Sequence, residues 1–335
     1  MSARVCLVFP HPEHGGGEVA MTEVAQGLAG ELDLDVCVLA NDPSRCPIGN
    51  ELEDRFGTVG LIRRRWELRP RFRAADAVLW YGVVNAVPDV LSSMGRRPAS
   101  VRVVHTDREV DGPGFQRRWR RAIDRTVCVN PAVARRLPGS VFIPNPGSPD
   151  RVRGPRLDHF PPGRKTLGFL GRLVPQKNAA WLVEHAAQHD CNLLLQAFDT
   201  PLQTVEDLEQ LAAECKTSDR VRFLPPGWDV GTLVKSVDAV VIASQHEGFP
   251  MAVIEAAMVG TPVIATRVGA LPELFADEIL FVEREGDVPS LGSMAQALAR
   301  LAPSWGRRLR DKAVPLCDRR EVVRRYAEVL RDALC

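Results

Sequence analysis

The sequence lacks the marks of several large protein classes. None of its eight cysteines forms a Cys-x-x-Cys pair or clusters with histidine, which excludes a zinc framework and a disulfide scaffold. No run of about 18 apolar residues, the length that a membrane-spanning helix needs, is present. The first residues hold no apolar stretch of signal-peptide length. We therefore expect a cytoplasmic protein with reduced thiols.

An excess of charge of one sign is also missing. The chain has 43 basic and 42 acidic residues and a net charge of +1, so nucleic acid is not an expected partner. Arginines do cluster locally, at residues 63–73 and 117–125. Docking of these segments on an anionic membrane is one hypothesis. Interspersed acids and a thin apolar face favour a solvated surface instead.

Short apolar runs, rich in β-branched residues, alternate with helical patterns along the whole chain. The runs do not alternate in polarity, as expected for parallel strands covered on both faces. The predicted strands are Val5–Phe9, Val36–Ala40, Val59–Ile62, Ala77–Tyr81, Val101–His105, Thr126–Val129, Val141–Pro144, Thr166–Leu170, Asn192–Gln196, Val221–Leu224, Ala239–Ala243, Pro262–Ala265 and Ile279–Val282. The predicted helices are Glu18–Ala29, Phe115–Arg125, Pro131–Leu137, Ala179–Gln188, Val205–Lys216, Asp229–Val237, Met251–Val259, Gly292–Leu301 and Arg319–Ala333.

This alternation predicts an α/β fold with two doubly wound, Rossmann-like domains. A stretch rich in proline and glycine at 146–163 separates them. We predict an N-terminal domain at 1–150 and a second domain at 151–318, with the last helix, 319–335, packing back on the first domain. Ligands of open parallel sheets bind at the carboxyl ends of the strands, so we expect the two domains to face each other across a ligand-binding cleft.

The first predicted strand is followed by three consecutive glycines, Gly15, Gly16 and Gly17, which open a helix at Glu18. Glycine lets the backbone approach a ligand closely, and a helix N-terminus attracts phosphate. The spacing is not Gly-x-Gly-x-x-Gly, which disfavours a nicotinamide or flavin site. A flexible loop that only caps the helix is the alternative.

Two cations follow the first strand of the second domain. Arg172 and Lys177 lie just past the strand end and just before a helix. Such cations neutralise a diphosphate leaving group, at about 4 kcal/mol for each charge pair 4 Å apart at an effective dielectric near 20. Solvated surface charges are the alternative interpretation.

The most informative stretch surrounds Glu247 and Glu255. Glu247 lies in the loop at a helix entrance, and Glu255 lies in the second turn of that helix among apolar residues. Carboxylates bind vicinal sugar hydroxyls well, because each accepts two or more hydrogen bonds. A buried acid is costly unless it has a partner. The intervening turn, whose backbone amides point to the same place, comprises Gly248, Phe249, Pro250 and Met251.

These motifs resemble those of the retaining GT-B glycosyltransferases of family four, the glycosyl transferases group 1. The resemblance rests on the Glu-x7-Glu stretch from Glu247 to Glu255 and on the following GTPVIATRVG and Pro-Glu. The stretch GRLVPQKN, the glycine loop and IPNP at 143–146 support it. It is dense over 165–283 and sparse from 30 to 125.

The resemblance implies that Glu255 binds the ribose hydroxyls of a nucleotide and that Glu247 contacts the donor sugar. The amides of residues 248–251 then hold sugar hydroxyls and phosphate. Arg172 and Lys177 bind the diphosphate, and the loop at residues 15–17 closes over it.

In the first domain the resemblance implies a role for His105, at the end of its strand. A hydrogen bond to the sugar is expected rather than general-base catalysis. Relatives have His-Asp here, whereas this chain has His-Thr-Asp, so the aspartate's role does not transfer directly to Asp107. Trp228 follows Pro-Pro-Gly where relatives hold the base, and either stacks on it or packs as an ordinary aromatic side chain.

The activity implied is that of a hexosyltransferase. A hexosyl or N-acetylhexosaminyl group would move from a UDP- or GDP-linked sugar to an acceptor hydroxyl, with retention and without a metal. No cofactor is expected besides this nucleotide-sugar co-substrate. Asp33 and Asp35 have the spacing of a DxD metal motif, but they precede the second strand, at the wrong end of the sheet.

Several alternatives remain open. A compact chain favours a small acceptor, such as an aminocyclitol or another natural product, over a lipid-linked cell-envelope acceptor, and makes a membrane surface the less favoured partner. A nucleotide-sugar epimerase would need acid/base groups that we cannot place. A phosphorylase would need pyridoxal phosphate and a longer chain. A binding protein without turnover is disfavoured by the intact set of charged residues.

Overall fold

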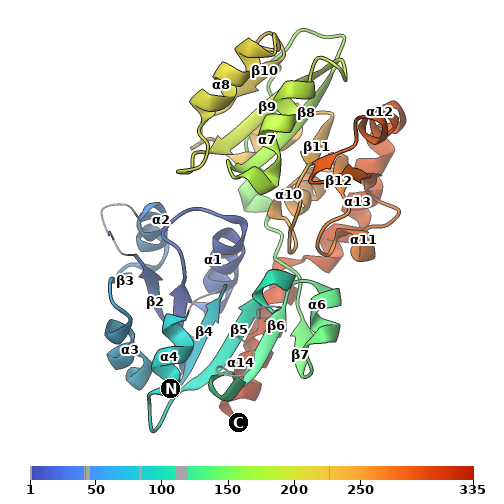
Figure 1. Ribbon diagram of the computed structural model, residues 1–335. Helices are drawn as coiled ribbons and strands as arrows, with labels where there is room; N and C mark the ends of the chain where they lie inside the picture. The colour runs from blue at the N-terminus through green and yellow to red at the C-terminus, as the bar shows by residue number, and fades with distance from the viewer. Residues whose placement is uncertain (1, 41, 43–45, 83–84, 111–119, 226) are drawn as a thin grey trace. The chain divides into compact units, whose positions relative to one another are not determined.

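The computed structural model describes residues 2–40, 42, 46–82, 85–110, 120–225 and 227–335. The chain divides into two compact units, residues 1–146 with 318–335, and residues 147–317. Each unit contains a parallel sheet covered by helices. Figure 1 shows both sheets with their helices. The prediction of an α/β fold with two doubly wound parts is therefore confirmed.

The sheet of the first unit has seven parallel strands among the described residues, in the order β3-β2-β1-β4-β5-β6-β7. Its central strands are apolar on both faces, and every residue of β4 is buried. The bounds are β1 (Arg4–Phe9), β2 (Asp33–Leu39), β3 (Gly60–Ile62), β4 (Ala77–Tyr81), β5 (Ala99–Val104), β6 (Arg125–Cys128) and β7 (Ser140–Phe142).

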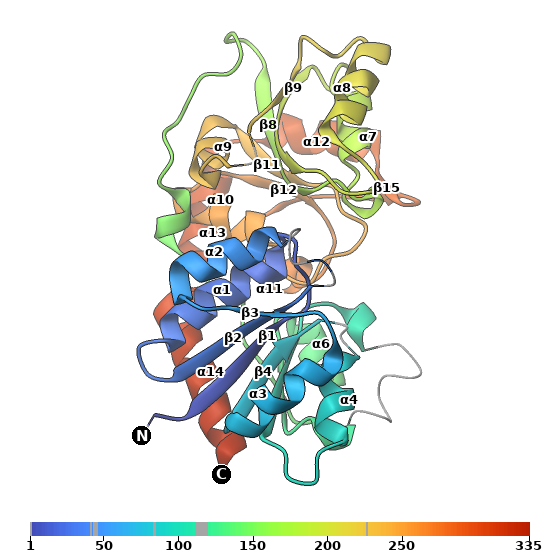
Figure 2. The same cartoon turned by 90° about the vertical axis from the view of Figure 1, so that its left-hand side faces the viewer.

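Helices cover both faces of this first sheet. They are α1 (Gly16–Leu28), α2 (Pro47–Phe56), α3 (Leu68–Ala74), α4 (Ala86–Ser92), α6 (Pro131–Arg136) and α14 (Arg319–Leu334), with short 3-10 turns η2 (Arg65–Glu67), η3 (Asp107–Glu109) and η4 (Arg120–Ala122). The last helix, α14, contacts α1, β4 and β5, and Figure 2 shows α3 and α14 on opposite sides of the strands. A Cβ on Gly27 of α1 would lie 2.3 Å from Val323 Cγ2 of α14. The two helices therefore pack so closely here that residue 27 has no room for a side chain.

The second unit repeats the pattern with six parallel strands in its main sheet, in the order β10-β9-β8-β11-β12-β13. The bounds are β8 (Lys165–Arg172), β9 (Cys191–Phe198), β10 (Val221–Phe223), β11 (Ala239–Ile242), β12 (Val263–Thr266) and β13 (Leu280–Val282). A small antiparallel hairpin, β14 (Arg284–Glu285) with β15 (Val288–Pro289), follows the last of these strands.

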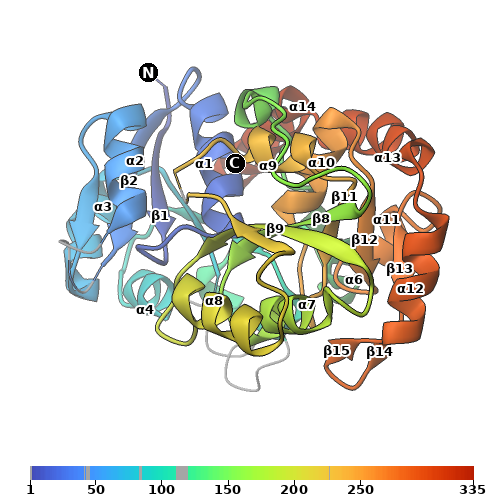
Figure 3. The ribbon, with the colours of Figure 1, turned by 90° about the horizontal axis from the view of Figure 1, so that it is seen from above.

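The helices of the second unit are η5 (Pro149–Val152), η6 (Pro175–Lys177), α7 (Ala179–His185), α8 (Val205–Glu214), α9 (Val230–Ser236), α10 (Met251–Val259), α11 (Leu271–Leu274), α12 (Leu291–Arg300) and α13 (Pro303–Leu316). Figure 3 shows α7 and α8 on one side of β8 and β9, with α9 and α10 on the other. The α10 helix ends at Gly260 in a left-handed conformation. A Cβ on Gly306 of α13 would lie 1.9 Å from the Gly260 carbonyl oxygen, so α13 packs closely on the end of α10.

Each predicted strand is present, within three residues at either end. The sequence patterns missed α2, α3, α4, α11, α13 and the hairpin. Of these, α3, α4 and α11 have seven residues or fewer, too few for an amphipathic pattern to repeat. The predicted helix at 115–125 is wrong in its described part, since Arg120–Ala122 is a 3-10 turn and Arg125 begins β6; residues 115–119 lie outside the described residues. Asp33 and Asp35 lie within β2 rather than before it.

Candidate functional site

Glu247 lies in the loop between β11 and α10, and its ion-pair partner, Lys177, follows the end of β8. Lys177 ends the η6 turn that follows β8, the neighbour of β11 in the sheet. Its Nζ lies 2.5 Å from Oε1 of Glu247, and the two side chains are 20% and 11% exposed. Ser244 donates its hydroxyl to the same Glu247 oxygen at 2.7 Å. The structure therefore brings two predicted site residues into direct contact.

Arg172 precedes the η6 turn that holds Lys177. It ends β8 and is half-buried. Gly171 just before it has a φ of +155°, and a Cβ there would lie 3.9 Å from Cε of Lys177. The lysine side chain thus lies along the glycine backbone at the strand end. Arg172, Lys177 and Glu247 thus all follow the carboxyl ends of β8 and β11, the edge at which ligands of parallel sheets bind.

Glu255 lies in α10, and only 3% of it is exposed. The sequence required a partner for this acid, and the structure identifies one. Arg151 of η5 donates from Nε to Oε1 of Glu255 at 2.9 Å. Sequence reasoning missed Arg151, because it is 104 positions away and lies in the segment taken as a linker. The ion pair offsets part of the cost of burying the carboxylate in an otherwise apolar helix.

The turn from Gly248 to Met251 is braced by the next strand's loop. Ala270 donates its backbone N–H to the Gly248 carbonyl at 2.8 Å. Phe249 packs against Phe275 with ring centroids 5.9 Å apart. Pro250 has no N–H, so it is wrong to count it among the donors of this turn. Met251 begins α10, and the N-terminal amides of that helix follow directly.

The first unit gathers its own polar group at the carboxyl ends of β1, β4 and β5. Gly15 is the N-cap of α1, and Gly16 and Gly17 form its first turn. A Cβ on Gly17 would lie 3.4 Å from Tyr81 and 3.6 Å from Nε2 of His105. The rings of Tyr81 and His105 meet edge to face at 5.4 Å. The glycine loop and His105 are therefore neighbours within this unit.

Burial shapes the chemistry of His105. It lowers the pKa of His105 to about 4, so the imidazole is neutral at pH 7. Its backbone N–H donates to Glu109 Oε1 at 3.0 Å, and Glu109 forms a buried ion pair with Arg102 at 3.5 Å. This support for the His105 turn was not anticipated from the sequence. Asp107 is exposed, and its Oδ1 accepts a hydrogen bond from the backbone N–H of Arg108.

Trp228 lies on the surface of the second unit, with 42% of its area exposed. Gln196 in β9 donates its side-chain amide to the Trp228 carbonyl at 2.6 Å. This bond ties the segment before α9 to the carboxyl end of β9. An exposed indole held in this way suits stacking on a planar ligand, and its role remains a prediction.

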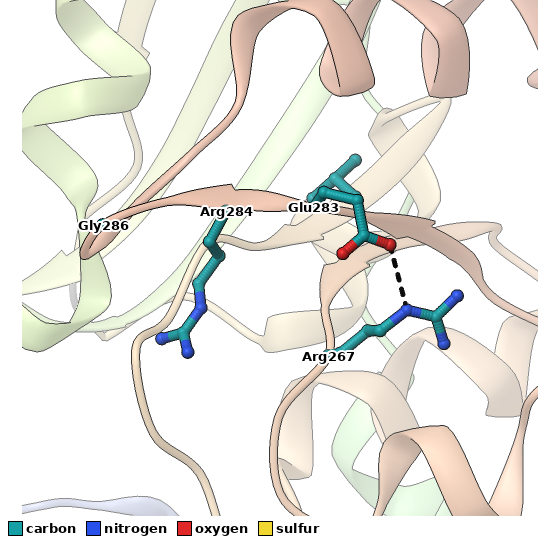
Figure 4. Close-up of a pocket in the computed structure, with 5 residues that line it drawn as sticks. Arg267, Glu283, Arg284 and Gly286 are labelled. Carbon is teal, nitrogen blue, oxygen red and sulfur yellow. Dashed lines mark hydrogen bonds and ion pairs between the residues drawn. The ribbon is translucent and has the colours of Figure 1, made fainter.

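A pocket of about 290 Å³ opens beside the Glu247 loop. Its lining includes Arg267 after β12 and Glu283 after β13, joined by an ion pair of 3.2 Å, as Figure 4 shows. Arg284 also lines it and donates to the Gln245 carbonyl at 3.0 Å, two residues before Glu247. The sequence analysis did not predict this pocket: Arg267 belongs to the GTPVIATRVG stretch, whereas the other lining residues, within 282–286, belong to no motif.

The arginine-rich segments are partly neutralised. Arg65 pairs with Asp89 at 3.2 Å, and Arg71 pairs with Asp35 of β2. Trp66, between them, is 62% exposed. The basic residues at 117–119 lie outside the described residues. In the part of the chain that is described, no helix combines the length and apolar character needed to cross a membrane.

No group of three or more His, Cys, Asp or Glu side chains is placed to hold a metal ion among the described residues. That the reaction needs no metal was implied by the family resemblance, and it stays a prediction.

Comparison with known proteins first defines a class. A glycosyltransferase from Rickettsia africae has a TM-score of 0.78 at 16% identity over 99% of both chains. HepE from Anabaena, solved in complex with UDP and glucose, has a TM-score of 0.77 at 16% identity, with 98% of this chain and 100% of that chain covered. The avilamycin glycosyltransferase AviGT4 has a TM-score of 0.65 at 20% identity, with 99% and 98% covered. The chain therefore has the GT-B fold.

The second unit matches the model of a known family. Residues 158–299, which contain Arg172, Lys177, Glu247 and Glu255, match the family model "Glycosyl transferases group 1". This segment is thus similar to that family, in agreement with the resemblance. A D-inositol 3-phosphate glycosyltransferase of Salinispora tropica is 35% identical over 181 residues, 49% of this chain and 37% of that protein. Its counterpart in Actinosynnema mirum is 32% identical over 48% of this chain and 41% of that protein. The match thus spans about two fifths of these relatives' length.

Proposed function

We propose that the protein is a glycosyltransferase that moves a hexosyl or N-acetylhexosaminyl group from a nucleoside-diphosphate sugar to an acceptor hydroxyl, with retention. The observation that carries this proposal is the contact of Lys177 with Glu247 beside Arg172. A carboxylate that can bind sugar hydroxyls contacts one cation that can bind a diphosphate, and a second cation, Arg172, ends the strand that leads to it. The match of the same segment to the model of the glycosyl transferases group 1 supports the assignment.

Chemically, the reaction requires the sugar–phosphate bond to break while negative charge collects on the diphosphate. Arg172 and Lys177 stabilise that charge more in the transition state than in the ground state, which accelerates the reaction. Because two cations already neutralise the leaving group, we propose that the reaction needs no metal. Glu247 holds the sugar, and Glu255, oriented by Arg151, holds the nucleotide's ribose.

We propose that the donor is a UDP- or GDP-sugar. HepE has been solved with UDP-glucose, which supports a uridine nucleotide. For the acceptor we propose a small polyol, such as an aminocyclitol or a related natural product. Two observations support it: several relatives are named D-inositol 3-phosphate glycosyltransferases, and AviGT4 is described as involved in avilamycin A biosynthesis.

A lipid-linked acceptor is the second candidate, and exposed Trp66 between basic residues is the observation that favours it. Co-sedimentation with vesicles of neutral lipid, with and without an anionic lipid, separates the two candidates. Binding that requires anionic lipid supports the lipid-linked acceptor, and equal recovery in the supernatant supports the small one. A nucleotide-sugar epimerase differs from both, because it would convert the donor without any acceptor.

The donor is identified by thermal-shift measurements with UDP, GDP, dTDP and their sugars, followed by an assay of nucleoside-diphosphate release with candidate polyols. We expect one nucleotide to raise the melting temperature and its release to depend on acceptor. Retention is read from the anomeric coupling constant of the product, and metal independence from full activity in EDTA. An absence of any shift with all three nucleotides would contradict the proposal.

A further inference from the structure

Asn178 directly follows Lys177, between η6 and α7, and has a left-handed backbone with φ 55° and ψ 35°. Non-glycine residues adopt this conformation rarely, and asparagine tolerates it better than most. The residue is buried, with 8% exposed. Its side chain makes no capping bond to α7. The asparagine side chain must therefore have another use.

That use is to join two other segments of the unit. The Asn178 amide nitrogen donates to the Ala243 carbonyl at 2.8 Å and to the Asp287 carbonyl at 2.7 Å. An amide NH2 group has two hydrogens, so both are used. Ala243 follows β11, one residue before Ser244, and Asp287 lies in the turn between β14 and β15. One side chain thus links the η6 turn, the Glu247 loop and the β14–β15 hairpin.

A second set of bonds reinforces the same junction around Gln245. Its N–H donates to the Gln176 carbonyl at 2.8 Å. Its carbonyl accepts from Arg284 of the hairpin at 3.0 Å. The peptide groups of Gln245 are therefore held by the η6 turn on one side and by the hairpin on the other. Glu247 lies two residues further along this loop.

We propose that Asn178 is a positioning residue, which holds Lys177 opposite Glu247 before the donor arrives by fastening the η6 turn and the β14–β15 hairpin to the Glu247 loop. The inference rests on the proposed function, because it assigns Asn178 a part in the turnover of a nucleotide sugar. Groups that are aligned in advance need no reorganisation as charge develops, and a misplacement of about 1 Å costs roughly 100-fold in rate.

Two substitutions separate the side chain from the backbone. Asn178→Gly keeps the left-handed conformation without steric cost and removes both donors. Asn178→Asp keeps the size, but its carboxylate donates nothing and faces two carbonyl oxygens. Lys216→Gly is the matched control, because Lys216 has a φ of 57° and lies exposed in the same unit, outside the proposed site.

Turnover is measured as nucleoside-diphosphate release at saturating donor, normalised to nucleotide-binding sites counted by calorimetry. We expect kcat to fall about 10- to 100-fold in Asn178→Gly and Asn178→Asp, while the nucleotide Kd stays within about threefold. Lys216→Gly should keep the wild-type kcat. Unchanged kcat per binding site in Asn178→Gly would overturn the proposal, since a merely structural role lowers the folded fraction and not this ratio.

A measurement without ligand keeps the inference distinct from the proposed function. Hydrogen exchange of the Gln245 amide, which is bonded to Gln176, should be faster in both Asn178 variants and unchanged in Lys216→Gly. If the Gln245 amide exchanged at the same rate in the wild type and in the Asn178 variants, the positioning role of Asn178 would be overturned, even if the enzyme were active. A wild-type protein that binds no nucleotide sugar would refute the proposed function instead, whatever the exchange shows.

Discussion

Lys177 and Glu247, 70 residues apart in the chain, form an ion pair at the carboxyl ends of two neighbouring strands. The pair satisfies both charges, and under the proposed function a nucleotide sugar would offer each partner a new contact. Donor binding would therefore replace one contact by two, lysine to phosphate and carboxylate to sugar hydroxyl. This exchange makes the pair the natural place to test the function.

Replacement of Lys177 by methionine should lower kcat about 100- to 1,000-fold, because one group that stabilises transition-state charge is lost. The donor KM should change much less. Steady-state kinetics of nucleoside-diphosphate release measure both values. Lys165→Met is the control, since Lys165 begins the same strand, β8, at its opposite end. An unchanged kcat in Lys177→Met would remove Lys177 from the catalytic machinery.

Loss of the Glu255 carboxylate should weaken nucleotide binding. Hydrogen bonds to charged groups contribute about 1.5–3 kcal/mol, so Glu255→Ala should raise the Kd about 10- to 100-fold in calorimetry. Glu278→Ala removes another ion-paired acid of the same unit, partner of Lys312, and should leave the Kd as it is. Equal Kd values for wild type and Glu255→Ala would refute the ribose assignment.

Substitutions of Glu255 and Arg151 should affect the stability of the fold and the affinity for nucleotide in different ways. Glu255→Ala leaves Arg151 without its carboxylate in a mostly buried position, which costs stability. Combining Arg151→Met with Glu255→Met should recover part of that loss, because an apolar pair can replace a buried ion pair. Nucleotide affinity should not recover. Urea denaturation and calorimetry on the single and double variants check this, and recovered affinity would show that the carboxylate is dispensable.

Gly269 should be intolerant of any side chain. It has a φ of +57°, and a Cβ there would lie 2.2 Å from the Gly248 carbonyl oxygen, beside Glu247. Gly269→Ala should therefore displace the turn at residue 248 and lower kcat about 10-fold or more. Gly260→Ala shares the positive φ but meets only Arg310 Cδ at 3.8 Å. It should lose only about 1–3 kcal/mol of stability and keep kcat. Similar kcat losses in both variants would contradict the clash.

His105 should make the protein less stable in mild acid. Its pKa in the folded state is about 4, below the ordinary 6.5, because burial disfavours the charged ring. Between pH 6.5 and 4 the unfolded chain takes up a proton that the folded chain does not, so stability falls as the pH falls through this window. Urea denaturation at pH 7 and pH 5 should show a smaller loss in His105→Gln than in the wild type.

Gly27 should be required for the packing of the C-terminal helix. A Cβ at this position would meet Val323 of α14 at 2.3 Å, whereas a Cβ on Gly30 would meet nothing within 4 Å. Gly27→Leu should therefore cost about 1–3 kcal/mol or more and speed hydrogen exchange in α14. Gly30→Leu should have little effect on either measurement. Equal exchange in the two variants would show that α14 tolerates a side chain at residue 27.

The sequence alone determined the fold class. Unbroken apolar runs such as Ala77–Tyr81 and Ala239–Ala243 are expected to be buried on both faces, and their alternation with helices then predicts parallel, doubly wound sheets. The sequence also placed Lys177, Glu247 and Glu255 at strand ends and in a helix entrance, because these positions follow from local order along the chain. The family segment at 158–299 agrees with that placement.

Only the tertiary structure decided which residues meet. The partner of Glu255 was required by the cost of burying a charge, yet nothing local distinguishes Arg151 from the other arginines. The left-handed Asn178, the Gln245 bonds and the Gly27 contact likewise depend on segments far apart in the chain. Hydrophobic period and turn chemistry are local properties, whereas side-chain pairing depends on register and packing between elements. The structure therefore adds to the predicted charges the contacts that hold them in place.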